Sequence, residues 1–585
     1  MSQFAINLLF VGASFALYTW IAIWARAKTT EEFYIAGGEV PAAFNGMATA
    51  ADWLSAASFI SVTGLISAGY VNSSFIMGWT GGYVLLATLL APYLRSFGTF
   101  TVPDFVGKRY DSKAARLVAV ISLLIVSLTY VIGQMTGAGV AFSRFLEVDS
   151  STGLIFSSII VFFYAVLGGM KAVTYTQVAQ YVVLILAFTI PAVFISLQLT
   201  GQFMPQLGFI GTHTESGLPL LAKLNEVVRE LGFQDYTADV SNKWNMFLFT
   251  LTLMAGTAGL PHVIVRFFTV SKVSDARWSA GWALIFIAIF YTTAPPLAAM
   301  TRLTLITKIY PQGTDQPALE YENRAEWFKK WEETGLLAFE DKNNDGRIQL
   351  YNDKNTEFGE TVAAERGWKG SELIINNDIL VLAAPEIANL PGWVIGLIAA
   401  GGIAAALSTA SGLLVAISSA VSHDLIKNTL KPDLSDKSEM LIARISMVGA
   451  IIIATLLGLN PPGFAAQTVA LAFGMAASSI FPVLVMGVFF KRVNAKGAVV
   501  GMVLGSLFTI TYIFTYLGWF FIPGTNTLEN IPSEWILGIS PLSVGAIGAT
   551  INFIAAFVVS SATEAPSQEL QDAVEAMRYP KKSEA

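Results

Sequence analysis

The chain alternates long apolar stretches with mostly short polar connections. Windows of about 20 mostly apolar residues, enough to cross a bilayer as a helix, begin near residues 5, 41, 74, 115, 150, 176, 243, 277, 391, 438, 464, 495 and 540. This pattern predicts an all-α integral membrane protein with thirteen transmembrane helices. The lipid bilayer is then the surrounding medium of most of the chain.

Two connections are much longer than the others, at residues 200–242 and 302–377. The second is strongly polar and predicts a small domain outside the membrane. We therefore expect helices 1 to 8 in residues 1–301, a polar extracytoplasmic insertion in 302–377, helices 9 to 13 in 378–562, and a cytoplasmic tail in 563–585. The charged tail has some helical periodicity, which predicts a solvated helix.

The distribution of lysine and arginine predicts how the chain is oriented. Short cytoplasmic loops carry an excess of these residues, whereas long loops cross the membrane largely regardless of charge. With the N-terminus outside, the short outer loops receive little besides Arg144, while the inner loops receive groups of basic residues around Arg26, Arg109, Lys171, Arg266, Lys427 and Lys491. We therefore expect a multi-pass protein of a bacterial-type inner (plasma) membrane with its C-terminus in the cytoplasm.

The composition narrows the functional classes. The chain is 54% hydrophobic and only 13% charged, which leaves too little polar surface for a soluble globule. It contains no cysteine, and its three histidines lie far apart, so thiol chemistry and a zinc motif are not expected. No nucleophile–base pair or phosphate-binding loop is recognisable. The sequence thus predicts neither an enzyme nor a nucleic-acid-binding protein.

Two apolar stretches contain residues that are typical of interrupted helices. Asp52 lies between Gly46 and Gly64, and a second break is predicted at Gly256–His262, which includes Pro261. A carboxylate near the bilayer centre costs roughly 2.5 to 3.5 kcal/mol, so it is expected beside a cavity, a cation or a polar partner. Interruptions at matching places in two halves are typical of inverted-repeat transporters, here with repeats in helices 2–6 and 7–11. The alternative is that glycine and proline are simply common in membrane helices.

Four sequence blocks give the chain a resemblance to the sodium:solute symporter family over nearly its whole length outside the insertion. The blocks are Phe33-Tyr-Ile-Ala-Gly-Gly38, Gly168-Gly-Met-Lys-Ala-Val-Thr-Tyr175, Gly259-Leu-Pro-His-Val-Ile-Val-Arg-Phe267 and the stretch from Gly487 to Gly505. The resemblance implies a leucine-transporter-type 5+5 inverted repeat core with one extra helix before it and two after it. It also implies a secondary active transporter that uses Na+ as its coupling ion.

The resemblance further implies where the sodium ion binds. The family holds it between the broken first core helix and the eighth core helix, with main-chain carbonyls from both and two hydroxyls. Such hard oxygen ligands suit sodium. In this sequence the matching residues are Ala50 and Trp53 in helix 2, and Ala405, Ser408 and Thr409 in helix 9. Without the resemblance, the two hydroxyls would be interpreted as helix-packing groups.

Two neighbouring positions qualify this prediction. Asp52 lies beside the expected ion. It is predicted to tune the affinity of the site for sodium or the gating of the transporter, and it is not assigned as a ligand. Family members thought to bind a second sodium carry an acid where this chain has Gln177. We therefore expect a single coupling ion.

The motifs around Asp52 and Pro261 most resemble the acetate and short-monocarboxylate permeases of the family. Bound sodium and helix N-termini can balance a carboxylate without a basic residue in the pocket. The residues expected to line the substrate site are Ser55, Ser58, Gln134 and Thr257, and the alternative, favoured for each residue taken alone, is a packing role. The alternative substrates are an amino acid such as proline or another small solute.

A different class, a membrane sensor built on a symporter-like domain, is also conceivable. Symporter-like domains are sometimes fused to signalling modules, but nothing resembling one follows helix 13. The family resemblance also leaves room for a small two-helix membrane subunit as a partner, because relatives with a long outer insertion are associated with one.

The insertion contains a stretch that resembles the calcium loop of an EF-hand. Oxygen-bearing side chains occupy positions 1, 3, 5 and 9, a glycine occupies position 6, and position 7 would contribute its carbonyl. The glutamate expected at position 12 is replaced by asparagine. The candidate Ca2+ ligands are Asp341, Asn343, Asp345, Arg347, Gln349 and Asn352. The alternative is a polar turn rich in Asn, Asp and Gly that binds no ion.

Overall fold

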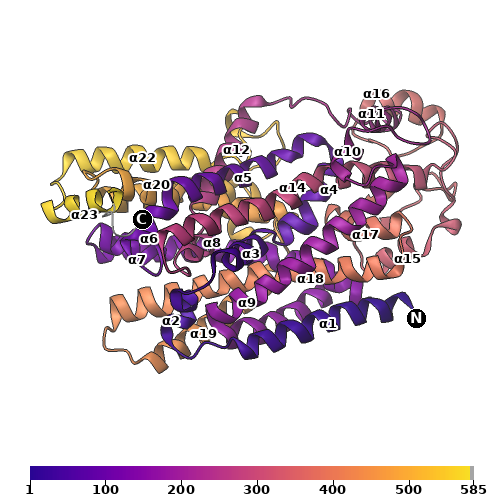
Figure 1. Cartoon of the computed structure of the whole chain (residues 1–585). Coiled ribbons are helices and arrows are strands. Elements are labelled where there is room, and N and C mark those ends of the chain that lie inside the picture. Colours follow the sequence, from indigo (N-terminus) through magenta and orange to yellow (C-terminus); the bar gives the residue numbers. More distant parts are fainter. Residues whose placement is uncertain (580–585) are drawn as a thin grey trace.

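The computed structural model describes residues 1–579, apart from the side chains of residues 163, 164 and 167. Its helices form one elongated bundle, with the start of α1 at one end and α23 at the other (Figure 1). Ten helices are long and apolar enough to cross a membrane, or up to twelve if two bent pairs each count as one span. The predicted helical membrane protein is confirmed, whereas the count of thirteen, which also needs the short apolar helix Ser150–Phe162, stays a prediction.

The helices of the bundle follow the apolar windows closely. The unbroken long helices are α1 (Gln3–Trp24), α8 (Lys113–Leu146), α14 (Val273–Ile309), α18 (Gly392–Ser419), α19 (Asp436–Gly458), α20 (Ala465–Phe489), α21 (Ala495–Leu517) and α22 (Gly545–Ala562). A further span, Tyr70–Phe97, contains α5 (Ser74–Leu85), a π-helical segment (Leu86–Leu90) and α6 (Ala91–Phe97). Two shorter helices lie at the end of the bundle that the distribution of basic residues predicts to face the cytoplasm. They are α2 (Thr30–Ile35) and α7 (Val102–Arg109).

The second span is broken beside Asp52. Helix α3 (Ala42–Trp53) ends there, and the chain resumes with a π-helical segment (Ala57–Ser61) and α4 (Val62–Ala68). The two halves differ in direction by 60°. The backbone N–H of Ala56, released by the break, donates to Gln134 Oε1 at 2.9 Å. A side chain of a neighbouring helix therefore satisfies part of the interrupted backbone, as a break inside a membrane requires.

The seventh span is broken at its predicted proline. Helix α12 (Lys243–Ala258) is followed by α13 (Pro261–Ile264), and the two directions differ by 46°. Pro261 is the first residue of the second piece, where its missing N–H costs nothing. Both interruptions thus lie where the sequence predicts them, in the first helix of each expected repeat.

Predicted helices 5 and 6 form one long element, α9 (Ser150–Thr200), with a sharp change of direction at Gly169. The φ of Gly169 is +67°, in the left-handed region that favours glycine. A Cβ there would also lie 2.7 Å from the ring of Phe33. Gly169 is therefore required by both the backbone turn and the close approach of α2.

The two long connections pack together into one unit at the end of the bundle where α1 begins (Figure 1). The first contains α10 (Pro205–Phe209) and α11 (Leu220–Arg229). The second, the insertion, contains α15 (Glu326–Glu333), α16 (Thr356–Phe358), and strands β1 (Leu337–Phe339) and β2 (Leu373–Ile375), which pair antiparallel. Asn352 joins the two connections, because its backbone N–H donates to Leu231 O at 2.9 Å.

The insertion returns to the bundle through a tight junction. After β2 the chain enters α17 (Leu380–Ile387), and on the way the backbone of Asn377 lies against Gly64 in α4. A Cβ on Gly64 would stand 1.9 Å from Asn377 O, so no other residue fits. Next to this contact, Asp378 Oδ2 accepts the N–H of Ala465, at the start of α20, at 3.2 Å.

The tail differs from the solvated helix that was expected. Its helix α23 (Gln568–Arg578) buries Val574 and Met577, which are 0% and 4% exposed. Glu575 pairs with Lys491, which follows α20. The tail is amphipathic, and its apolar face is docked on the bundle. Residues 580–585 of the predicted tail lie outside the described residues.

Candidate functional site

Asp52 lies at the end of α3 and is 1% exposed. Its Oδ2 accepts hydrogen bonds from Nε and Nη2 of Arg266, both at 3.1 Å, and its Oδ1 accepts one from Gln177 Nε2 at 3.2 Å. Gly412 of α18 closes the remaining side, since a Cβ there would stand 2.5 Å from Oδ1. The intramembrane acid is thus charge-paired and enclosed.

Arg266 is the partner that the sequence analysis missed. It follows α13, is 0% exposed, and also donates to Thr174 Oγ1 at 2.9 Å and to Gln177. Its carbonyl accepts from Asn45 of α3 at 2.9 Å, which ties the two broken spans together. The signal was present, because Arg266 is a basic residue inside an apolar block, but its orientation toward Asp52 depends on helix packing.

Gln177 connects the broken span to α18. Besides its contact with Asp52, its Nε2 donates to Ser408 O at 2.8 Å. The family resemblance pointed to an acid at this position in other members. In this chain the position holds a neutral amide, which bridges Asp52, Arg266 and the backbone of α18.

The two hydroxyls predicted for sodium make direct contact with the end of α3. Ser408 Oγ donates to Ala51 O and Thr409 Oγ1 donates to Asp52 O, both at 2.7 Å. Both side chains are fully buried. They cross between helices instead of only bonding their own preceding turn, which the packing alternative assumed. The predicted proximity of span 2 and span 9 is therefore present.

The three predicted carbonyl ligands lie around the same contact. Ala405 O accepts from Ser408 Oγ at 3.0 Å, Ala50 O accepts the N–H of Leu54 at 2.8 Å, and Trp53 O accepts from Ser58 Oγ at 3.3 Å. The oxygens that face Ser408 and Thr409 here are those of Ala51 and Asp52. The assignment of Ala50 and Trp53 as ligands stays a prediction.

A small cavity of about 10 Å³, roughly the room for one water molecule, lies between the two breaks. Several aromatic rings enclose it, with His262 set edge-on to Tyr130. The lining residues are Trp53, Ser58, Trp79, Tyr130, Leu260, His262, Val263, Tyr291 and Phe473. Within the described part of the chain, Trp79 Nε1 and His262 Nδ1 have no hydrogen-bond partner. The site is closed in this conformation and offers unpaired polar groups.

The predicted substrate-lining residues are distributed around the breaks. Ser58 borders the cavity and shares a 2.9 Å hydrogen bond with Tyr291. Gln134, Ser55 and Thr257 are buried but are not among the residues that line the cavity. Gln134 Nε2 and Thr257 Oγ1 have no partner within the described residues. The aromatic walls were not predicted, because an aromatic residue in an apolar helix resembles any lipid-facing or core residue.

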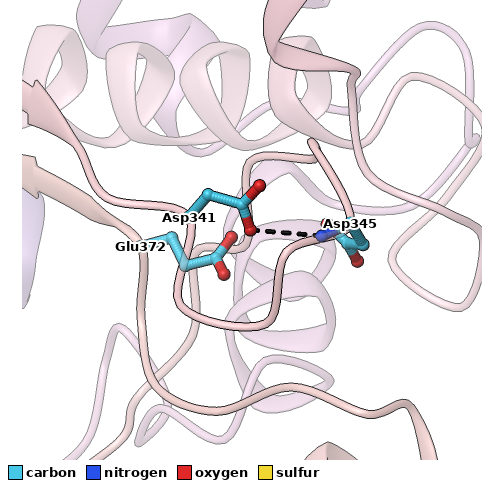
Figure 2. A group of neighbouring side chains, drawn as sticks. All are labelled: Asp341, Asp345 and Glu372. Atoms are coloured by element: carbon cyan, nitrogen blue, oxygen red, sulfur yellow. Dashed lines mark hydrogen bonds between the residues drawn. The ribbon is translucent and has the colours of Figure 1, made fainter.

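The predicted calcium loop lies in the insertion, far from this site. Asp341, Asp345 and Glu372 bring carboxylate oxygens within 4.8 Å of one another (Figure 2). Asn343 and Gln349 also reach the group, each donating to Asp345. Asn352 does not, because its amide donates instead to Gly232 O at 3.1 Å. Glu372 is an addition that the loop motif alone does not contain.

The model of the sodium:solute symporter family matches residues 33–304 and 364–505. The chain belongs to the sodium:solute symporter family. It is therefore a sodium-coupled solute symporter of the membrane and not an enzyme, as the four sequence blocks predicted. The gap between the two matched ranges, residues 305–363, falls within the insertion, so this part of the insertion is an addition to the family's shared part.

Two relatives agree with this membership, and a solved structure shares the fold. An uncharacterized symporter of Cupriavidus necator is 32% identical, with 95% of this chain and 91% of that protein covered. An uncharacterized symporter of Bacillus subtilis is 27% identical, with 88% and 86% covered. The structure of a Na+-coupled sialic acid symporter in a substrate-bound outward-open state superposes with a TM-score of 0.66 at 17% identity, covering 96% of this chain and 98% of that one. The leucine-transporter-type fold is confirmed by this likeness.

Proposed function

We propose that this symporter imports a small organic anion, with acetate or another short monocarboxylate as the substrate class, and that one sodium ion drives each cycle. The ion binds between the end of α3 and α18, and the solute binds in the aromatic cavity beside it. The observation that carries the proposal is the direct contact of Ser408 and Thr409 with carbonyl oxygens at the break of α3.

The proposed sodium ligands are the carbonyls of Ala50, Trp53 and Ala405 and the hydroxyls of Ser408 and Thr409. Of these oxygens, Ser408 Oγ and Ala405 O already lie 3.0 Å apart. The two hydroxyls bond the neighbouring carbonyls of Ala51 and Asp52, so a shift of the end of α3 would bring the five oxygens around an ion. The hydroxyls would then turn their lone pairs, in place of their protons, toward the shared space. Asp52 acts from the side, because Arg266 and Gln177 already occupy its oxygens.

The charge balance of the cavity favours an anion over an amino acid. A zwitterion such as proline needs a carboxylate or carbonyl groups for its ammonium, and no acidic side chain lines the cavity among the described residues. Asp52 is neutralised by Arg266. The unpaired N–H of Trp79 is a donor, and Ser58 and Tyr291 provide hydroxyls that can donate. Together with sodium these groups suit a single carboxylate of small volume.

We also propose that the N-terminus and the insertion face the outside of a bacterial-type inner membrane and that α23 faces the cytoplasm. The distribution of basic residues over the short loops supports this orientation. The insertion and the start of α1 lie at the same end of the bundle, as the orientation requires (Figure 1). The insertion would then be available to a small membrane subunit.

The test is uptake of radiolabelled acetate, propionate, pyruvate, proline and glucose into proteoliposomes with and without an inward sodium gradient. We expect sodium-dependent uptake of the short monocarboxylates and little uptake of proline or glucose. Sodium-driven uptake of proline with none of acetate, propionate or pyruvate would contradict the substrate class.

Two variants and a matched control test the ion site. Ser408→Ala and Thr409→Ala should each raise the sodium concentration for half-maximal uptake by about tenfold, the change expected for losing one ion ligand of about 1.4 kcal/mol. Ser418→Ala is the control, because this hydroxyl of α18 is equally buried but bonds only Val415 O of its own helix. Unchanged sodium dependence in both variants would remove the site assignment.

A further inference from the structure

The insertion holds carboxylates from two separate segments around one point. Asp341 and Asp345 belong to the loop after β1, whereas Glu372 immediately precedes β2 (Figure 2). Their oxygens lie within 4.8 Å of one another. Since Ca–O distances are about 2.3–2.6 Å, oxygens on opposite sides of a calcium ion lie about 4.6–5.2 Å apart. The spacing of this carboxylate cluster fits one such ion.

Glu372 provides the acidic side chain that Asn352, at position 12 of the loop, does not. It is 0% exposed, and its carboxylate accepts the N–H groups of Lys342 at 2.9 Å and Gln349 at 3.3 Å. These bonds hold it over the loop. Asn352, the twelfth residue of the loop, is turned to Gly232. A carboxylate from a distant part of the insertion thus stands where an EF-hand supplies its last ligand from within the loop.

The carboxylate cluster has no cationic partner within the described residues. The guanidinium of Arg347 bonds Ala318 O and Glu320, and Lys342 Nζ donates to Ser371 O at 2.8 Å. Burial, together with the nearby charge of Asp345, raises the pKa of Glu372. Three acids are therefore held together although the nearest basic side chains bond other groups.

Gln349 gives an independent indication of a ligand. It is 1% exposed and its amide end contacts both oxygens of Asp345, with Nε2 at 2.8 and 3.0 Å. Its Oε1 is buried and has no hydrogen-bond partner within the described residues. Turning the amide by 180° exchanges nitrogen and oxygen, an assignment that rests on the surrounding partners. A cation between Gln349 and Asp345 would favour the turned form and satisfy this oxygen.

We propose that the carboxylate cluster is a Ca2+ site whose final acidic ligand comes from Glu372. The other ligands are the side chains of Asp341, Asn343, Asp345 and Gln349 and the carbonyl of Arg347, which accepts no hydrogen bond within the described residues. Ca2+ accepts six to eight oxygens in flexible geometry, whereas Mg2+ demands a smaller octahedron and keeps several waters. An ion here joins the loop to the start of β2.

The position of the proposed site determines which segment a bound ion would stabilise. Shortly after Glu372, the chain passes Asn377, which lies against Gly64 of the broken span. Bound calcium therefore fixes the segment through which the insertion contacts α4. The site goes beyond the proposed transport activity, because it would hold its ion whichever solute the symporter carries.

The experiment uses purified full-length protein in nanodiscs, stripped with EGTA and titrated with CaCl2 or MgCl2 by calorimetry. We expect one Ca2+ per chain with a dissociation constant of roughly 10⁻⁵ to 10⁻³ M, and much weaker Mg2+ binding. Calcium should also raise the unfolding temperature of the protein. Absence of calcium binding, or equal binding of magnesium, would overturn the proposal.

Variants locate the ion. Glu372→Gln should weaken calcium binding at least about tenfold, as the loss of a charged ligand predicts. Glu340→Gln is the matched control, because Glu340 is an exposed acid directly before the loop. It should bind as the parent does. Parent-like affinity in Glu372→Gln, or loss of binding in Glu340→Gln, would refute the role of Glu372.

A second variant decides the question if Glu372→Gln does not fold. Gln349→Glu adds a charged oxygen to the carboxylate cluster, so it should bind calcium more tightly and be less stable than the parent in EGTA. Unchanged affinity in this variant would place any bound calcium elsewhere. Since the readouts are binding and unfolding, not uptake, neither outcome bears on the proposed substrate.

Discussion

The membrane core buries Asp52 and the insertion buries Glu372, but the two regions balance the charge of their acids differently. Asp52 meets Arg266 and Gln177, and these partners occupy both of its oxygens. The acids of the carboxylate cluster meet backbone N–H groups and amides, and no basic side chain pairs with them among the described residues. A paired acid can hold helices together without a ligand, whereas an unpaired cluster creates a demand for a cation.

The largest effect is expected from breaking the pair in the core. Arg266→Gln leaves Asp52 buried without its cation, which costs about 3–5 kcal/mol for a buried pair. We expect low yield of folded protein and a strongly reduced unfolding temperature, measured in detergent by tryptophan fluorescence.

Two further variants separate charge from packing at this pair. Asp52→Asn combined with Arg266→Gln should recover part of the lost stability, because the isolated charge is then absent. Arg277→Gln, an exposed position of α14, is the control and should leave the unfolding temperature unchanged. A single Arg266→Gln variant as stable as the parent would show that Asp52 does not depend on this partner.

The next effect tests how closely the core encloses Asp52. Gly412→Ala places a methyl group 2.5 Å from Oδ1, so either the carboxylate or α18 must shift. Overpacking of this kind costs about 1–3 kcal/mol, and the displaced carboxylate should also lower sodium-driven uptake.

The matched control is Gly449→Ala in α19, where a Cβ meets nothing within 4 Å. This change should be neutral or slightly stabilising, since alanine favours a helix over glycine. Equal unfolding temperatures and uptake rates for both glycine variants would contradict the enclosure of Asp52.

A smaller effect is expected from pH in the insertion. Because the pKa of Glu372 is raised in the folded protein, the folded state binds its proton more tightly than the unfolded state does. In EGTA, lowering the pH through this raised pKa should therefore stabilise the insertion, with a change of about 1–2 °C in unfolding temperature. With calcium bound, the same change should destabilise it, because protons displace the ion.

Hydrogen exchange of the backbone around β2 would localise this effect. Glu372→Gln should abolish the difference between EGTA and calcium, whereas Glu340→Gln should retain it. An identical pH response of the parent and Glu372→Gln would exclude Glu372 as the titrating group.

The smallest effect is expected for an acid–arginine pair that is exposed to water. Asp235 and Arg229 in the first long connection form two hydrogen bonds of 2.8 and 2.9 Å, but Arg229 is 65% exposed. Exposed pairs of this kind contribute little to stability, because water screens the two charges. Asp235→Asn should therefore change the unfolding temperature only slightly, and high salt should remove even that difference. A loss comparable to that of Arg266→Gln would contradict the distinction.

The sequence was sufficient to predict features that depend on local residue types, such as the interruption of a helix. Asp52 and Pro261 indicated the two breaks through their local chemistry, whereas Ser408 and Thr409 were expected opposite the first break because of the family resemblance. The docking of α23 could have been anticipated from the apolar face that contains Val574 and Met577.

Partners supplied by distant segments could not be predicted in the same way. Arg266 was visible in its block, but its direction depends on how α13 packs against α3 and α9. Glu372 completes the carboxylate cluster only because β2 pairs with β1, and three-residue strands leave almost no pattern in a sequence. Asn352 had the right position in the loop but is held by Gly232, a contact between two long connections.

The fit between Gly64 and Asn377 has a mechanical consequence. Since the two backbones touch without room for a methyl group, α4 cannot tilt without pushing the segment that leads out of β2. We therefore expect the insertion to move together with α4. A cross-link or an antibody that immobilises the insertion should arrest the transport cycle, although neither touches the transport site.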